Sequence, residues 1–334
     1  MKLSSGIVDG REQALVLAEG GSWAVKRLAQ HYGTGTEPST VAEVMAAGEE
    51  FLEILGEWTA AAFREALTYD RVERSLAPIP HPGKVICVGL NYLPHAEETR
   101  LEIPQYPVLF NKFADSIVGD HAIVTGPAHS QLDYEAELVM VMGKRCVKVD
   151  ESDALDYVFG YCNGNDISSR ALQFRTSQWL LGKALPGFGP IGPWVVTRDD
   201  VADPDALDIV GKRNGNLVQH SNTKHMIFSC RTLISYISQY MTLNPGDIIF
   251  TGTPEGVIMG KPERNFPSYG VKLASNPSPV SNGCLYNLFS GAICEAGRKI
   301  FLIGVRLTLT DRTRRQQQIL DYLQIPEPMA KPVI

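Results

Sequence analysis

Residues 131–142 read QLDYEAELVMVM, and this stretch decides the fold because it places charge at the start of a buried strand. Polar and apolar side chains alternate up to Leu138, and four apolar residues follow. This pattern predicts a strand that enters a buried sheet. Because side chains alternate across a strand, Asp133, Glu135 and Glu137 are expected to share one face.

Three carboxylates on one strand face require compensation. Neighbours on such a face lie about 6.6 Å apart, and at an effective dielectric of about 20 they repel by about 2.5 kcal/mol. Protons, arginines or a divalent cation can offset this repulsion, and a hard cation that takes carboxylate oxygens suits the spacing best. A solvated strand face is the alternative that this stretch alone leaves open.

The composition indicates a globular protein with a substantial core, since 44% of its 334 residues are hydrophobic. The 31 basic and 37 acidic residues give a net charge of −6 without a basic stripe, which argues against a nucleic-acid partner. No apolar run approaches the length of a membrane span, and the first residues form no hydrophobic signal region. We therefore expect a soluble, cytoplasmic protein.

The six cysteines are scattered along the chain without a CxxC pair. Neither a zinc site nor a disulfide framework is indicated, so we interpret them as reduced thiols. They are Cys87, Cys146, Cys162, Cys230, Cys284 and Cys294.

The chain divides into two predicted domains, 1–77 and 78–334. The first is expected to be a small α+β domain, with short strands near 6–8 and 14–18 and helical periodicity between 41 and 67. A proline-rich connector at 77–83 cannot continue a helix and marks the boundary. Beyond it, short strands alternate with Gly and Pro turns, which favours a β-rich domain over a doubly wound parallel sheet.

A candidate acid–base pair follows the first strand of the second domain. Pro94 suits the first turn of a short helix, and His95 and Glu98, three residues apart, would share one of its faces. A carboxylate beside an imidazole raises the basicity of the imidazole. A histidine that removes a proton from water requires this. The alternative is that Glu98 complements the helix dipole and His95 is a surface residue.

A second polar group follows the run FGYCNGN at 159–165. Asp166, Arg170 and Gln173 stand at i, i+4 and i+7, so a helix that begins near Asp166 would project all three to one side. An acid, a cation and an amide together can hold a metal and an anionic substrate. An ordinary N-cap aspartate with an arginine partner is the alternative.

Two further candidates lie in predicted loops. Lys183 stands in a glycine-rich turn, and Thr251 and Thr253 follow an apolar strand. Such side chains can bind carboxylates, although solvated loops have the same composition.

With these segments in order, the chain resembles the fumarylacetoacetate hydrolase family, whose members act on 2-oxo and 2,4-dioxo acids. The resemblance runs from about Pro78 to Val257, and several motifs in the right order are far more specific than any one alone. The motifs are VGLNYLPHAEE, PVLFNK, LDYEAEL, GYCNGNDISSRALQ, GKALPGFGPIGPW, VQHSNTKHMIF and TLNPGDIIFTGTPEGV.

The resemblance implies a metal bound by Glu135, Glu137 and Asp166, with Mg²⁺ or Mn²⁺ as the expected ion and Ca²⁺ as a further candidate. Asp133 belongs to the motif without being a ligand in the family, so we expect its charge to meet a neighbouring donor.

It also implies a lid helix that carries His95 and Glu98, and Lys183 as a catalytic residue. Substrate-binding positions fall on Arg170, Gln173 and Thr253.

The fold implied by the family is a mixed β-sandwich roll that forms homodimers, with a small N-terminal domain in many members. The implied substrates are small 2-oxo or 2,4-dioxo acids, as in aromatic catabolism. We expect hydrolysis of a C–C bond in an acylpyruvate, because the His–Glu pair supplies the base that a water nucleophile needs. Oxaloacetate decarboxylation and isomerisation of a 2-hydroxy-diene-dioate are alternatives, and an inactive ligand-binding homologue is an alternative of another class.

The chain departs from the family pattern in two places. Ala184, Leu185 and Pro186 stand where members usually carry Ser and Asp. After Val257, a segment rich in Ser, Asn and Pro replaces the expected glycine turn and closing strands up to Cys294, and an apolar run and a polar tail follow. We interpret this segment as an inserted loop near the site that affects substrate choice or the dimer edge.

Overall fold

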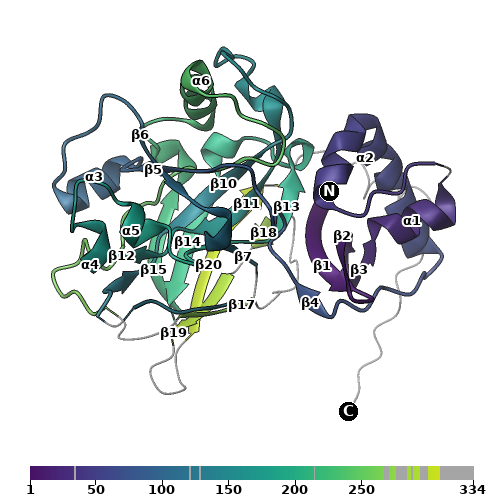
Figure 1. The fold of residues 1–334 in the computed structure, drawn as a ribbon, viewed down its shortest axis with the longest axis horizontal. Helices are drawn as coiled ribbons and strands as arrows, with labels where there is room; N and C mark the ends of the chain where they lie inside the picture. The colour runs from purple at the N-terminus through teal and green to yellow at the C-terminus, as the bar shows by residue number, and fades with distance from the viewer. Residues whose placement is uncertain are drawn as a thin grey trace.

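The computed structural model describes residues 1–266, apart from positions 34, 120, 121, 128 and 214, and the backbone of four strands beyond them. Within these residues, the strands form a sheet of eleven strands, a sheet of seven and a two-stranded ribbon. The two larger sheets and the helices around them make up one body, with the N-terminal segment at one end (Figure 1).

The larger sheet has the order β3-β2-β1-β13-β11-β10-β16-β5-β6, with β4 beside β1 and β7 beside β13. It is mixed, because β16 pairs in parallel with β5 while most other neighbours are antiparallel. Its strands are β1 (Lys2–Val8), β2 (Arg11–Ala18), β3 (Gly21–Ala24), β4 (Arg74–Ser75), β5 (Val85–Gly89), β6 (Val108–Lys112), β7 (Ile117–Val118), β10 (Ala136–Met142), β11 (Val158–Asn165), β13 (Gly189–Thr197) and β16 (Ile248–Phe250).

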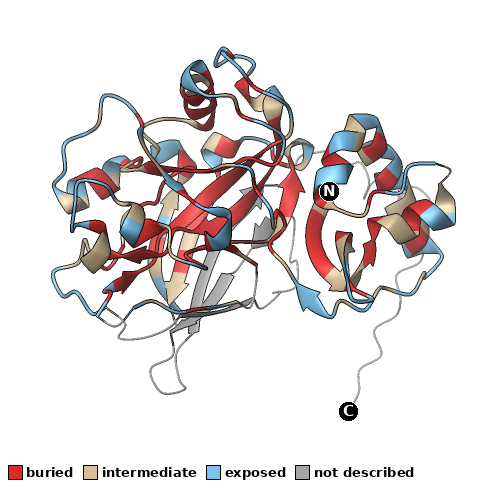
Figure 2. Ribbon diagram, viewed as in Figure 1, coloured by how far each residue is buried: buried red, intermediate tan, exposed pale blue. Residues whose placement is uncertain are grey.

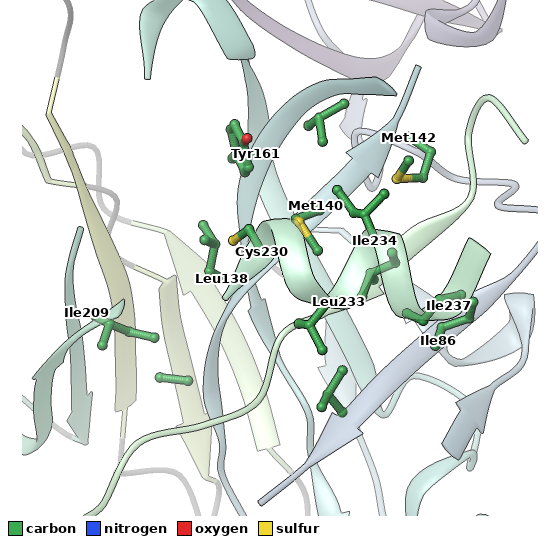
Figure 3. Close-up of a cluster of buried hydrophobic side chains, with 14 of the residues drawn as sticks. Ile86, Leu138, Met140, Met142, Tyr161, Ile209, Cys230, Leu233, Ile234 and Ile237 are labelled. Atoms are coloured by element: carbon green, nitrogen blue, oxygen red, sulfur yellow. The ribbon is translucent and has the colours of Figure 1, made fainter. Parts of the chain in front are cut away.

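Strand β10 is the centre of the molecule, and every one of its residues is buried. Leu138 and Met140 point into one hydrophobic cluster, and Val139 and Val141 point into another on the opposite face. The first cluster includes residues of helix α6 (Cys230–Tyr240), such as Leu233, as Figure 3 shows. Burial on both faces explains why the polar–apolar alternation of the sequence stops at Leu138.

The smaller sheet has the order β15-β14-β20-β19-β17-β8, with β18 beside β20. Its strands are β8 (Ile123–Val124), β14 (Asp208–Arg213), β15 (Asn216–Asn222), β17 (Val271–Ser275), β18 (Cys284–Tyr286), β19 (Phe289–Ile293) and β20 (Ile300–Thr308). Strands therefore occur where we predicted an inserted loop in place of closing strands, and that prediction is wrong for 271–275, 284–286 and 289–293, where the backbone is described. The polar tail lies outside the described residues.

The N-terminal segment contains helices α1 (Val25–Tyr32) and α2 (Val41–Arg64), which pack on β1–β3. Thr40 caps α2 in a reciprocal capping box with Glu43, which explains where the helix begins. Strand β1 pairs with β13, so the N-terminal strands extend the larger sheet. The two parts also share a hydrophobic cluster, and buried residues run from one into the other in Figure 2.

The predicted fold class is confirmed: the chain is α+β and β-rich, with a mixed roll preceded by a small α+β region. The short helices of the site are α3 (Leu93–Thr99), α4 (Arg170–Gln173) and α5 (Leu180–Lys183), and the two-stranded ribbon pairs β9 (Leu132–Asp133) with β12 (Ser168–Ser169). No helix among the described residues is long and apolar enough to cross a membrane. Four of the cysteines are free and buried, and the side chains of Cys284 and Cys294 lie outside the described residues.

Candidate active site

Three buried carboxylates gather at one end of the two central strands. Ligand atoms of Glu135, Glu137 and Asp166 lie within 4.8 Å of one another. Strand β10 begins where its antiparallel neighbour β11 ends, so Glu137 pairs with Gly164, and the backbone N–H of Asp166 donates to the Glu135 carbonyl at 2.9 Å. The sheet register thus brings together acids that are about thirty residues apart in the chain.

The acidic stretch is not one continuous strand. Strand β9 ends at Asp133, and β10 begins at Ala136. Asp133 turns to other donors, and its carboxylate accepts backbone hydrogen bonds from Ile258 at 2.8 Å and Met259 at 3.0 Å. Arg170 Nε also donates to Asp133 at 2.9 Å. Neighbouring donors therefore compensate the charge of Asp133, as we expected.

Three buried cations surround the acids. Lys183 Nζ lies 2.7 Å from both Glu135 Oε2 and Asp166 Oδ2. Arg170 Nη2 lies 2.7 Å from Glu135 Oε1, and Lys112 Nζ lies 2.6 Å from Asp166 Oδ1. Lys183 also stands 5.0 Å from the centre of the Phe110 ring, a favourable cation–π distance.

The environment pushes the pKa values of two neighbouring acids in opposite directions. Burial raises the pKa of Glu135, but Lys183 and Arg170 outweigh it, so the net pKa lies below the usual range. Burial raises the pKa of Glu137 well above its usual value, and the nearby charges of Asp166 and Glu135 raise it further. The backbone N–H of Gly252 donates to Glu137 at 2.8 Å and only partly opposes this effect.

These residues fit a divalent cation. All three donors are carboxylates, the ligands that Mg²⁺, Mn²⁺ and Ca²⁺ prefer. A cation beside Glu137 would offset the burial and the two like charges that disfavour its charged form and raise its pKa. Gly252 can approach this carboxylate because it has φ +101°, and a Cβ there would lie 2.7 Å from the Cβ of Asn91.

The predicted helix that begins near Asp166 is wrong. Strand β11 continues to Asn165, Ser168 and Ser169 pair with β9 as β12, and helix α4 begins only at Arg170. Backbone pairing with β9 therefore prevails over the helical spacing. Arg170 and Gln173 still lie together, because Arg170 Nη1 donates to Gln173 Oε1 at 2.9 Å.

His95 and Glu98 lie on helix α3, with Pro94 in its first turn as predicted. Their Nδ1 and Oε2 atoms are 3.5 Å apart, which is long for a hydrogen bond. The backbone N–H of Gly256 donates to both oxygens of Glu98 at 3.1 Å, which holds the helix against the loop after β16. His95 is 6% exposed and close enough to the acids for its charge to act on the pKa of Glu135, after burial and the two stronger cations.

Of the two loop candidates, Lys183 differs from its predicted setting, while Thr253 lies in the loop that follows the apolar strand β16, as predicted. Lys183 ends helix α5 rather than standing in a turn. The hydroxyl of Thr253 donates to the Ala136 carbonyl at 3.0 Å and accepts from Gln219 Nε2 at 2.9 Å. The Thr253 hydroxyl therefore donates its hydrogen bond to the protein main chain.

Two buried residues of this region were missed by the sequence reasoning. Lys112 ends strand β6, and Gln219 joins Thr253 to the start of β10 by accepting from the Ala136 N–H at 3.0 Å. Both lie inside motifs of the family resemblance, PVLFNK and VQHSNTKHMIF. A lysine at the end of a strand that begins with three apolar residues was the available signal for Lys112.

The fold and the buried acidic cluster define a fumarylacetoacetate-hydrolase-like protein. The family model described as "Fumarylacetoacetate (FAA) hydrolase C-terminal" matches residues 84–275. The chain therefore belongs to the fumarylacetoacetate hydrolase family, as the motifs predicted.

Two curated relatives illustrate the sequence similarity. A "Fumarylacetoacetate hydrolase domain-containing protein 2 homolog" from Dictyostelium discoideum is 51% identical over 192 residues, which are 54% of this chain and 63% of that protein. The match thus spans less than two thirds of that relative's length. "Oxaloacetate tautomerase FAHD2A, mitochondrial" from Homo sapiens is 42% identical over 229 residues, which are 66% of this chain and 71% of that protein.

Solved structures extend the similarity over most of the chain. A putative HpcE protein from Mycobacterium smegmatis has 33% identity and a TM-score of 0.68, covering 90% of this chain and 98% of its own. A fumarylacetoacetate hydrolase from Exiguobacterium antarcticum has 30% identity and a TM-score of 0.66 with the same coverage. The N-terminal region therefore has counterparts in solved members of this fold.

Proposed function

We propose that the protein is a divalent-metal-dependent enzyme that interconverts the keto and enol forms of oxaloacetate or a closely related 2-oxo dicarboxylic acid. The observation that carries this proposal is the buried cluster of Glu135, Glu137 and Asp166. Relatives from Xenopus laevis and Homo sapiens that are named oxaloacetate tautomerases, at 45% and 42% identity, support the choice of reaction. This reaction class replaces C–C hydrolysis as our first choice.

The proposed mechanism moves one proton between carbon and oxygen. A bound divalent metal would polarise the 2-oxo group and so make the hydrogens on C3 more acidic. His95 takes a proton from C3, with Glu98 beside Nδ1 to keep the imidazole oriented and basic. The proton returns to the C2 oxygen, so the substrate's atoms and electrons balance without a co-reactant. Lys183 places positive charge beside the ligands, where negative charge develops on oxygen.

Hydrolysis of an acylpyruvate is the second candidate, and one observation favours it. Attack by water requires a positioned base, which His95 and Glu98 can supply. The solved fumarylacetoacetate hydrolase from Exiguobacterium antarcticum supports the same possibility. Decarboxylation of oxaloacetate passes through the same enolate, so its rate is measured in the same experiment. An inactive ligand-binding homologue would turn over none of these substrates.

The test is a direct comparison of reactions on purified protein. Enol oxaloacetate is followed by its ultraviolet absorbance with Mg²⁺, with Mn²⁺ and with a chelator, and acylpyruvate cleavage and pyruvate formation are measured in parallel. We expect metal-dependent acceleration of ketonisation above the other two rates. Equal ketonisation with and without enzyme, under metal saturation, would remove the proposal. The homodimer and the cytoplasmic location stay predictions, the second because several relatives carry mitochondrial names.

A further inference from the structure

Lys112 is the least expected charged residue of the site. Its side chain is fully buried at the end of strand β6 and has 0% exposure. A buried ammonium is costly unless it is paired, so its contacts must compensate its charge. Lys112 Nζ lies 2.6 Å from Asp166 Oδ1 and also contacts the main-chain oxygens of Lys183 and Ile167.

Lys112 and Asp166 form an ion pair rather than a well-directed hydrogen bond. Within the described part of the chain, Asp166 Oδ1 accepts no well-directed hydrogen bond, although Lys112 Nζ lies 2.6 Å from it. The other oxygen, Oδ2, faces Lys183 at 2.7 Å. Each oxygen of this proposed metal ligand therefore faces its own positive charge.

The charges of the whole cluster nearly cancel. Among the described residues, it contains four carboxylates and three cations, a formal balance of −1 when all are charged. The carboxylates are Asp133, Glu135, Glu137 and Asp166, and the cations are Lys112, Arg170 and Lys183. A divalent cation changes the balance to +1, and one chelating carboxylate then brings it to zero. A dianion such as oxaloacetate or oxalate brings it to −1, and to −2 if Lys112 is absent. Charge neutrality inside a buried site is favoured, because burial penalises net charge.

We infer that Lys112 is a charge-balancing residue that lowers the intrinsic affinity of the site for the divalent cation and raises its affinity for the substrate carboxylate. This inference rests on the proposed metal-dependent function and assigns a part of it to Lys112, whose contacts among the described residues are with Asp166, Ile167 and Lys183. Without Lys112, the balance is −2 for the protein alone and zero with the cation. The buried site would then favour the cation and disfavour the added carboxylate.

A merely structural role for Lys112 predicts a different result. If the lysine only holds Asp166 and Lys183 in place, its loss disorders the ligands and weakens the binding of both the cation and the carboxylate. If it balances charge, the two affinities shift in opposite directions. The sign of the two shifts, rather than their size, therefore distinguishes the roles.

The experiment is calorimetry on Lys112→Met and Lys112→Gln. Each is titrated with Mg²⁺ or Mn²⁺, and then, at metal saturation, with oxalate as a short chelating anion. We expect metal binding to tighten about tenfold or more and oxalate binding to weaken by a similar factor, since a unit charge at this range in a buried site has an effect at least that large. Lys144→Met is the matched control: it removes a positive charge from an exposed pair with Glu49 and should change neither affinity.

The possible outcomes separate the inference from the function on which it rests. Failure of the wild-type protein to bind either metal would remove the proposed metal-dependent function. If the wild-type protein binds metal and both variants bind it with weakened or unchanged affinity, the inference about Lys112 is overturned, while the proposed metal-dependent function stands. Lys112→Gln keeps a donor for the two main-chain oxygens without the charge. If this variant does not fold, as circular dichroism would show, Lys112 is structural and the inference is wrong.

Discussion

Gly260 offers a sharp test of the pair His95–Glu98, because it lies directly against the Glu98 carboxylate. A Cβ added at Gly260 would stand 2.3 Å from Glu98 Cδ and 2.5 Å from Oε2. Carbon atoms in contact are normally about 3.5 Å or more apart, so Gly260→Ala must push this carboxylate back by more than about 1 Å. Glu98 would then leave both the Gly256 N–H and the His95 ring.

The expected effect is on catalysis rather than on folding. A misplacement of about 1 Å in catalytic geometry can cost about 10²-fold in rate, and we expect a loss of that order in kcat. Metal affinity should be unchanged, because Glu98 is not one of the three clustered carboxylates that we propose as metal ligands. The free energy of unfolding should change by less than about 1 kcal/mol. The displaced group is the end of a flexible side chain, Gly260 is not in the left-handed region, and Gly→Ala reduces the entropy of the unfolded chain.

The assay is steady-state ketonisation of oxaloacetate, with thermal denaturation measured on the same samples. Gly56→Ala in α2 is the matched control, since among the described residues a Cβ there meets only Met1 Cε, at 3.7 Å. In a Glu98→Ala background, Gly260→Ala should have no further effect on kcat. A double-mutant cycle gives this result when Gly260→Ala acts on kcat only by displacing Glu98. A wild-type kcat for Gly260→Ala would refute the reasoning that Glu98 orients the catalytic base.

The remaining predictions concern the metal, the base and the lid. Glu137→Ala should weaken Mg²⁺ binding in calorimetry by more than about 10²-fold, beyond the loss typical of an outer-shell partner, and unchanged affinity would contradict its role as a ligand. His95→Ala should lower kcat for ketonisation and for acylpyruvate cleavage by about 10²- to 10⁴-fold while metal affinity stays the same. Decarboxylation of oxaloacetate should fall much less, and a near-normal rate of ketonisation would exclude His95 as the base. Residues 92–102 should gain hydrogen-exchange protection when metal and oxalate bind, because helices that carry catalytic groups over a site commonly close on the substrate. Equal protection in both states would argue against a closing lid.

The sequence was most informative where a pattern was local or shared with the family. Glu135 and Glu137, and the pair on α3, were visible as spacings, and each of these pairs lies together in the structure. Asp133 does not join the other two acids, because the strand is interrupted between Asp133 and Ala136. The helix expected from Asp166 was wrong, because the register of β9 and β12 is set by residues about 35 positions apart. Lys112 escaped notice for the same reason: its partners Ile167 and Lys183 follow it by 55 and 71 residues. Spacing rules describe neighbours along the chain, and the charges of this site are matched across the sheet.

The junction of β1 with β13 has a consequence for how the chain is handled. The proline-rich connector at 77–83 suggests a place to cut, yet β1 covers the backbone of β13 at Val195 and Val196. A fragment without β1 would present an open strand edge and a stripped apolar face, which are the features that lead sheets to stick to one another. The N-terminal segment therefore protects the edge of the larger sheet from pairing with another chain. A family member without this segment would need another element to cover the same edge.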